Sequence, residues 1–218
     1  MQRTIVVKGE GSLSLKPNMV EISLTLESLK KDYEETVKLA NQKIEQIQYC
    51  LSKIGFKKED LKTTHFNVNS KYKSVRNENG DYTSVFEGFL CNHQLKLKFD
   101  FNKEKLAEVL SVIAKSEVDP KFYIAFTVKD SEEVEKELLK DICESARRKA
   151  ELLCEASNVK LGQLVNIEYN WGEINIYSRT NYDTCLKGER RMAKAAAIEI
   201  EPEDIEVRDT ATLVWEII

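Results

Sequence analysis

The stretch VVKGEGSLSLKPNMVEISL, residues 6–24, places two glycines one residue apart inside a pattern that otherwise predicts a β-strand. Apolar and polar residues alternate here, and Gly9 and Gly11 share the parity of Leu13, so all three fall on the apolar face. A Gly-x-Gly-x-x-Gly phosphate fingerprint needs a third glycine and a helix start where this chain has Ser14 followed by more strand. The glycines instead indicate that another element approaches the strand closely, or that the strand bends.

The break Lys16-Pro17-Asn18 separates two alternating stretches, residues 5–15 and 20–27. Proline and asparagine favour turns, and two strands joined by so short a link usually pair with each other. We therefore expect the first two strands to form an antiparallel hairpin.

Hydrophobic periodicity predicts the remaining elements, with Asp32 and Ser131 as the N-caps of two long helices. Asn79-Gly80 is a strong tight-turn signal and predicts a long hairpin between the third and fourth strands. The stretch RRMAKAAA, residues 190–197, fits either a short helix or a connection, and the order of residues 179–200 stays open. The expected helices cover residues 32–54, 102–116 and 131–157, and the expected later strands cover residues 62–76, 84–101, 121–129, 161–178 and 204–217.

These elements repeat one order, β-α-β-β, with the repeats beginning at the strands 19–28 and 121–129. We expect an α+β fold of two β-α-β-β-like units, with mostly antiparallel sheets packed against two long helices and a shorter connecting helix. The apolar stripe of the first helix also fits a coiled coil, but its flanking strands favour a helix laid across a sheet. We expect a single domain over residues 1–218, with internal halves at 1–101 and 121–218.

The totals are those of an ordinary globular protein: 218 residues, 42% hydrophobic, 32% charged, with a net charge of −4. This charge gives no electrostatic footprint for nucleic acid, and no apolar run approaches the roughly 18 residues that a membrane span needs. The five cysteines include no C-x-x-C pair, which favours thiols in a reducing compartment. We expect a cytoplasmic protein, although an envelope location stays open if an export signal has been removed.

Histidine and cysteine supply few candidates for chemistry. Cys91 and His93 form a Cys-x-His pair, but a zinc site needs three or four ligands and no second compact pair is nearby in sequence. His65 has the parity opposite to Phe66, which predicts that it faces solvent or a neighbouring strand. We therefore interpret these residues as structural and expect no metal or other cofactor.

The other cysteines divide by context. Cys50, Cys143 and Cys154 lie on or beside apolar helix faces, where small buried thiols are ordinary. Cys185 lies in a polar loop and is the candidate for a reactive thiol, as a labelling or oxidation site before a catalyst.

Charged clusters are interpreted as solvated surface, with one exception. The run Arg147-Arg148-Lys149 lies on a helix turn beside buried alanines, which predicts a solvent face. Arg190-Arg191 is the exception, because a basic, loosely structured arm can dock on an acidic neighbour. The acidic residues expected in solvated turns are Glu59, Asp60, Glu201, Glu203 and Asp204.

Five stretches occur in a characteristic order and spacing: VVKGEGSLSLKP, LSKIGFKKEDLKTTHFNVNSKY, IAFTVKD, ARRKAELLCEASNVKLGQLVNI and the tail IEPEDIEVRDTATLVWEI. On these stretches the chain resembles the SIMPL-domain family over nearly its whole length. The resemblance implies an α+β fold, homo-oligomers in some members and no established catalytic site. The chain reads Pro17-Asn18-Met19-Val20 where members commonly read Pro-Asp-x-Ala. Many members carry an export signal, which we do not expect from the opening residues of this sequence.

We therefore expect a non-enzymatic protein that self-assembles, most simply as a homo-oligomer, and serves as a scaffold or binding module. No catalytic, cofactor-binding or metal-binding residues are assigned. One alternative is a thiol-dependent hydrolase or redox enzyme that uses Cys185 or the Cys91/His93 pair. Another is a protein that holds a small apolar ligand between the two β-α-β-β units.

Overall fold

The computed structural model describes residues 3–76, 81–170, 172, 174–184 and 200–218. Within these ranges the chain forms two compact units, each built from separate segments. Unit 1 comprises Met1–Asn18, Thr127–Arg179 and Pro202–Ile218, and unit 2 comprises Met19–Phe126 and Thr180–Glu201.

The described helices and strands confirm an α+β fold. Their order is β1 (Thr4–Leu15), β2 (Met19–Lys30), α1 (Tyr33–Ser52), the 3-10 turn η1 (Lys58–Asp60), β3 (Leu61–Arg76), β4 (Tyr82–Asp100), α2 (Lys103–Ala114), β5 (Lys121–Thr127), α3 (Ser131–Ala156), β6 (Leu161–Tyr169), β7 (Tyr177–Thr184) and β8 (Ile205–Ile217).

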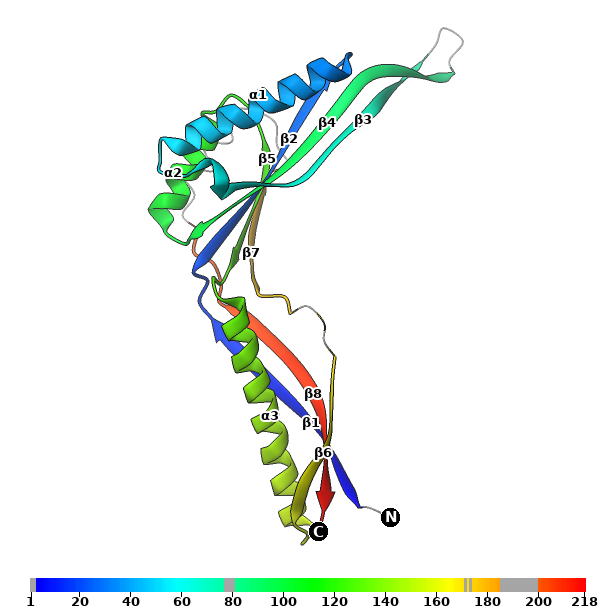
Figure 1. Ribbon diagram of the computed structural model, residues 1–218, viewed down its shortest axis with the longest axis vertical. Helices are drawn as coiled ribbons and strands as arrows, with labels where there is room; N and C mark the ends of the chain where they lie inside the picture. Colours follow the sequence, from blue (N-terminus) through cyan, green and yellow to red (C-terminus); the bar gives the residue numbers. More distant parts are fainter. Residues whose placement is uncertain (1–2, 77–80, 171, 173, 185–199) are drawn as a thin grey trace. The chain divides into compact units, whose positions relative to one another are not determined.

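Unit 2 is organised around a sheet in the order β3-β4-β2-β5-β7, with α1 and α2 on one face (Figure 1). The alternation of β2 turns Ile22, Leu24 and Leu26 toward the helices, where they are almost fully buried. Ile47 of α1 and Leu110 of α2 pack into the same core. The ends of β3 and β4 nearest their hairpin turn extend past the beginning of α1 (Figure 1).

Unit 1 is a sheet in the order β1-β8-β6 with α3 lying along it (Figure 1). β1 and β8 pair antiparallel without interruption, from Thr4 opposite Glu216 to Leu15 opposite Ile205. The core between sheet and helix is formed by Val7, Leu138, Ile142, Ala146, Val207 and Leu213, among others.

The two units share one topology. Unit 2 contains the antiparallel order β3-β4-β2 with α1, and unit 1 contains the antiparallel order β6-β8-β1 with α3. The predicted use of one β-α-β-β pattern twice is therefore correct in outline. The first strand of the second pattern is β1, however, and the strand expected at 121–129 forms β5 in the other sheet.

The predicted hairpin of the first two strands is wrong, because β1 pairs with β8 and β2 pairs with β4. Asn18, in the expected turn, instead makes hydrogen bonds with Thr127 and Lys129. The backbone N–H of Asn18 donates to the Thr127 carbonyl at 3.1 Å, and the Asn18 side chain accepts the Lys129 N–H at 2.8 Å. These bonds connect Asn18 to the segment that follows β5, and no hairpin forms at this turn.

The strand expected over 161–178 is also two strands in different sheets, β6 and β7. Between them, the Gly172 N–H donates to the Asn170 carbonyl at 2.8 Å. The pairing of β3 with β4 confirms the long hairpin, although its predicted Asn79-Gly80 turn and the stretch 190–197 lie outside the described residues.

Local signals predicted the helix ends within a residue or two. Asp32 caps α1, since its side chain accepts the Glu35 N–H at 3.0 Å. The cap of α3 is Asp130 rather than Ser131, because the Asp130 carboxylate accepts the Glu133 N–H while Ser131 is already helical. Near the end of α3, Leu153 is half exposed, and its neighbour Cys154 is buried.

Candidate functional site

Gly9 and Gly11 lie where α3 crosses β1, which confirms the predicted close approach of another element. A Cβ atom on Gly9 would overlap the Ile142 carbonyl and lie 2.8 Å from the Cβ of Ala146. A Cβ on Gly11 would lie 2.7 Å from Cγ1 of Ile142 and 2.8 Å from the Leu138 carbonyl. The missing side chains therefore admit the helix backbone.

This close contact lets side chains of α3 bind the outer edge of β1 at Lys8, Glu10 and Ser12. The Ser12 N–H donates to Oδ2 of Asp141 at 3.0 Å, and the Glu10 N–H donates to Oγ of Ser145 at 3.4 Å. One turn further along, Nζ of Lys149 donates to the carbonyl of Lys8 at 3.2 Å. Four residues of a helix advance about 6 Å and two residues of a strand about 6.6 Å. Every fourth residue of α3 therefore lies beside every second residue of β1.

β6 forms the opposite edge of the same sheet and, within the described residues, pairs only with β8. Its side chains Leu164, Val165 and Ile167 are 46%, 50% and 50% exposed. Its only charged residue is Glu168, and it contains no lysine or proline, the residues that commonly protect a sheet edge. The pairing of β6 with β8 shifts register twice before Asn166. Only Asn166–Tyr169 pairs with β8 without a shift.

β3 occupies the equivalent edge of unit 2, but it is rich in basic residues where β6 is nearly uncharged. Among the described residues it pairs only with β4, and α1 packs over β2 and β4. Its sequence LKTTHFNVNSKYKSVR contains no acidic residue, and its basic side chains are Lys62, Lys71, Lys73 and Arg76.

A row of aromatic rings runs along one face of the β3–β4 hairpin. The ring centroids of Tyr33 and Phe89 are 5.7 Å apart, those of Phe89 and Phe86 are 5.4 Å apart, and those of Phe86 and Tyr72 are 5.6 Å apart. Tyr72 is 60% and Phe86 42% exposed. This row could not be predicted from the sequence, because a register shift at Lys71/Tyr72 brings Phe86 and Phe89 to one face although they are three residues apart.

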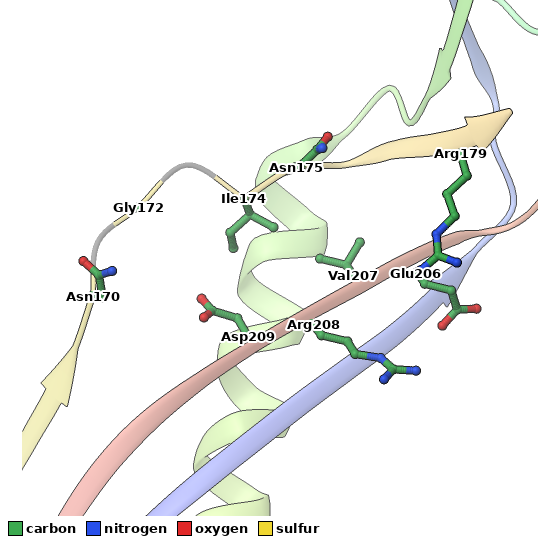
Figure 2. Close-up of a pocket in the computed structure, with 9 residues that line it drawn as sticks. All are labelled: Asn170, Gly172, Ile174, Asn175, Arg179, Glu206, Val207, Arg208 and Asp209. Atoms are coloured by element: carbon green, nitrogen blue, oxygen red, sulfur yellow. The ribbon is translucent and has the colours of Figure 1, made fainter. Parts of the chain in front are cut away.

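Unit 1 contains a cavity of about 600 Å³ where the chain between β6 and β7 passes β8 (Figure 2). Its lining includes two arginines, Arg179 and Arg208, and two carboxylates, Glu206 and Asp209. Beside it, the Tyr169 hydroxyl donates to Oδ2 of Asp209 at 2.6 Å, and this bond raises the pKa of Tyr169 to about 12. Tyr169 is thus a poor acid or base at neutral pH, and the balanced charges of the lining favour neither cations nor anions.

The Cys91/His93 pair lies buried on the face of β4 that α1 covers. Nε2 of His93 is 2.8 Å from Oγ1 of Thr63, whereas Nδ1 of His93 has no hydrogen-bond partner among the described residues. Burial lowers the pKa of His93 and raises the pKa of Cys91, the latter partly opposed by Lys43. A raised pKa disfavours the thiolate that a nucleophile or metal ligand needs.

Those of the remaining predicted residues that the structure describes do not converge on a site. Cys154 is buried as predicted and Cys50 is half-buried, but the prediction for Cys143 is wrong because it turns away from the buried stripe through Ile142 and is exposed. His65 is exposed. Cys185 and Arg190-Arg191 lie outside the described residues. Among the described residues, no group of three or more histidine, cysteine or acidic side chains is placed to hold a metal ion.

The charged clusters are solvated as predicted. Arg147, Arg148 and Lys149 are exposed, and Arg147 pairs with Glu151 at 3.0 Å. The five acidic turn residues are also exposed: Glu59, Asp60, Glu201, Glu203 and Asp204.

The geometry thus defines an α+β protein of two topologically equivalent units whose exposed sheet edges are its most distinctive surfaces. The model of the SIMPL family, described as a protein of unknown function (DUF541), matches residues 5–215, and the chain belongs to this family. No curated protein matches the chain. Among the described residues, no helix has the length and apolar character required to cross a membrane.

Proposed function

We propose that this protein is a non-enzymatic scaffold or binding module that self-associates, with the β6 edge as the contact to a second copy. The single observation behind the proposal is the contrast between the two edges of the unit 1 sheet. Side chains of α3 make hydrogen bonds to backbone N–H and C=O groups at the outer edge of β1. By contrast, β6 has half-exposed apolar side chains, and within the described residues it pairs with another strand on one side only.

β6 carries so little charge that it can pair with β6 of a second copy without strong repulsion. Like charges directly opposite each other destabilise strand pairs, and Glu168 is the only charge that the strand carries. In an antiparallel pair of two copies, Glu168 faces an uncharged residue in every register except the one centred on it. The regular stretch Asn166–Tyr169 is short, so the association is expected to be reversible and weak.

The thiol alternative has less support. Cys91 is fully buried and its pKa is raised by that burial, which opposes both nucleophilic attack and metal binding. The self-association proposal rests instead on exposed groups that a partner can reach.

Light scattering on a size-exclusion column tests the proposal. At about 100 µM the wild-type protein should have a weight-average mass above that of one chain, falling toward the monomer on dilution. Ile167→Lys introduces a charge on the β6 edge and should give a monomer at both concentrations, because an edge lysine opposes strand pairing.

Val6→Lys is the matched control, since Val6 is 62% exposed on β1, the strand whose outer edge α3 binds at Lys8, Glu10 and Ser12. This variant should associate as the wild type does. A monomeric wild-type protein at the higher concentration, or equal masses for the two lysine variants, would contradict the proposal. Circular dichroism melts of both variants establish that each is folded.

A further inference from the structure

The β3 edge of unit 2 is unsuited to pairing with its own copy. A strand of sixteen residues with four lysine or arginine side chains and no acidic one brings like charges together in a self-pair. Lys62 and Lys73 are exposed and make no ion pair among the described residues. The edge therefore disfavours a second β3 and favours a strand of opposite charge.

The two faces at this edge differ in chemistry. Successive side chains of a strand point to opposite faces, so Lys71 and Lys73 share one face while Tyr72 lies on the other. On the Tyr72 face the rings of Phe86 and Phe89 continue the apolar surface onto β4. On the lysine face Lys71 already pairs with Glu87 at 3.1 Å. Lys73 is the next lysine of this face along β3, and it makes no ion pair among the described residues.

We infer that β3 binds an extended acidic segment of a partner protein by strand addition. The main chain of the segment pairs with the open edge of β3. Its acidic residues alternate with apolar ones, so that the carboxylates reach Lys73 while the apolar side chains lie beside Tyr72 and its neighbouring rings. This inference concerns a different edge from β6 and does not depend on self-association.

Fluorescence anisotropy with a labelled peptide that alternates glutamate and valine tests the inference. The peptide should bind the wild-type protein, and Lys73→Glu should weaken the binding by about fivefold, as expected for reversing one exposed charge. Lys38→Glu on α1 is the matched control, because Lys38 is also exposed in unit 2 and the change in net charge is the same. Lys38→Glu should leave the affinity within about twofold of the wild type.

Two further probes separate strand addition from charge attraction alone. A peptide with proline in place of its central valines cannot complete the backbone pairing and should bind much more weakly. Tyr72→Ser should also weaken the binding of the original peptide, with a melting curve to establish that the variant is folded.

Four results would overturn the inference. The first is equal binding of the proline-containing peptide, and the second is an equal effect of the substitutions at Lys73 and Lys38. The third is an absence of peptide binding at about 1 mM, a limit that corresponds to only about 4 kcal/mol of binding energy. Binding of an oligonucleotide or of anionic vesicles in place of the peptide would likewise contradict it.

Discussion

At the residue scale, the absence of two side chains determines how unit 1 is assembled. Gly9 and Gly11 allow the backbone of α3 near Leu138 and Ile142 to contact β1 directly. The two glycines are therefore needed because they leave space for the helix. Any Cβ at these positions would meet backbone atoms, which cannot move aside as a flexible side chain can.

Gly9→Val should lower the free energy of unfolding by about 1–3 kcal/mol, because the added side chain forces α3 away from β1. Urea denaturation measures the change. Gly172→Ala is the control, since a Cβ there meets nothing within 4 Å. A Gly9→Val protein as stable as the control would show that the helix can shift without cost.

At the element scale, α3 serves both as a core helix and as a cover for a sheet edge. Its buried stripe passes through Leu138, Ile142 and Ala146, while Asp141 and Ser145 on the flank bind the N–H groups of β1. A sheet edge whose N–H groups are already satisfied offers little to another strand.

Removing both flanking groups, in Asp141→Ala/Ser145→Ala, should destabilise the protein by about 1–3 kcal/mol and open the β1 edge. The expected readouts are a lower urea midpoint and faster amide exchange in Thr4–Leu15. Glu144→Ala changes an exposed neighbour on the same helix and should alter neither quantity. Unchanged exchange in β1 would mean that these bonds do not protect the edge.

Elements defined by local signals could be predicted from the sequence, whereas pairings over long distances could not. The caps, stripes and hairpin turn of residues 32–101 are local, and the predicted α1 and β3–β4 hairpin are correct. The partner of β1 is nearly 200 residues away, and the bonds from Asn18 to the 127–129 segment leave no local signal. The parity of Gly9 predicted a close neighbour but not which helix supplies it.

The candidate surfaces were harder to predict than the fold. The basic residues of β3 and the apolar residues of β6 are visible in the sequence, but only the sheet orders make both strands edges. The aromatic row depends on the register shift beside Tyr72, which no sequence pattern indicates. The burial of Cys91 and His93 follows from α1 lying over β4, again a long-range arrangement.

At the scale of the whole molecule, one topology occurs twice with different edges. β6 and β3 hold equivalent positions in their sheets, yet β6 is apolar with one charge and β3 is uniformly basic. This difference in chemistry supports separate partners for the two edges: a second copy of the chain for β6 and an acidic strand for β3.

Hydrogen–deuterium exchange at two protein concentrations shows whether the protein self-associates through β6. Exchange in Leu161–Tyr169 should slow as concentration rises. Exchange in Lys8–Ser12 should stay constant, because side chains of α3 already bind that part of β1. Concentration-independent exchange in β6, or protection that appears only elsewhere in a protein that does associate, would contradict self-association through β6.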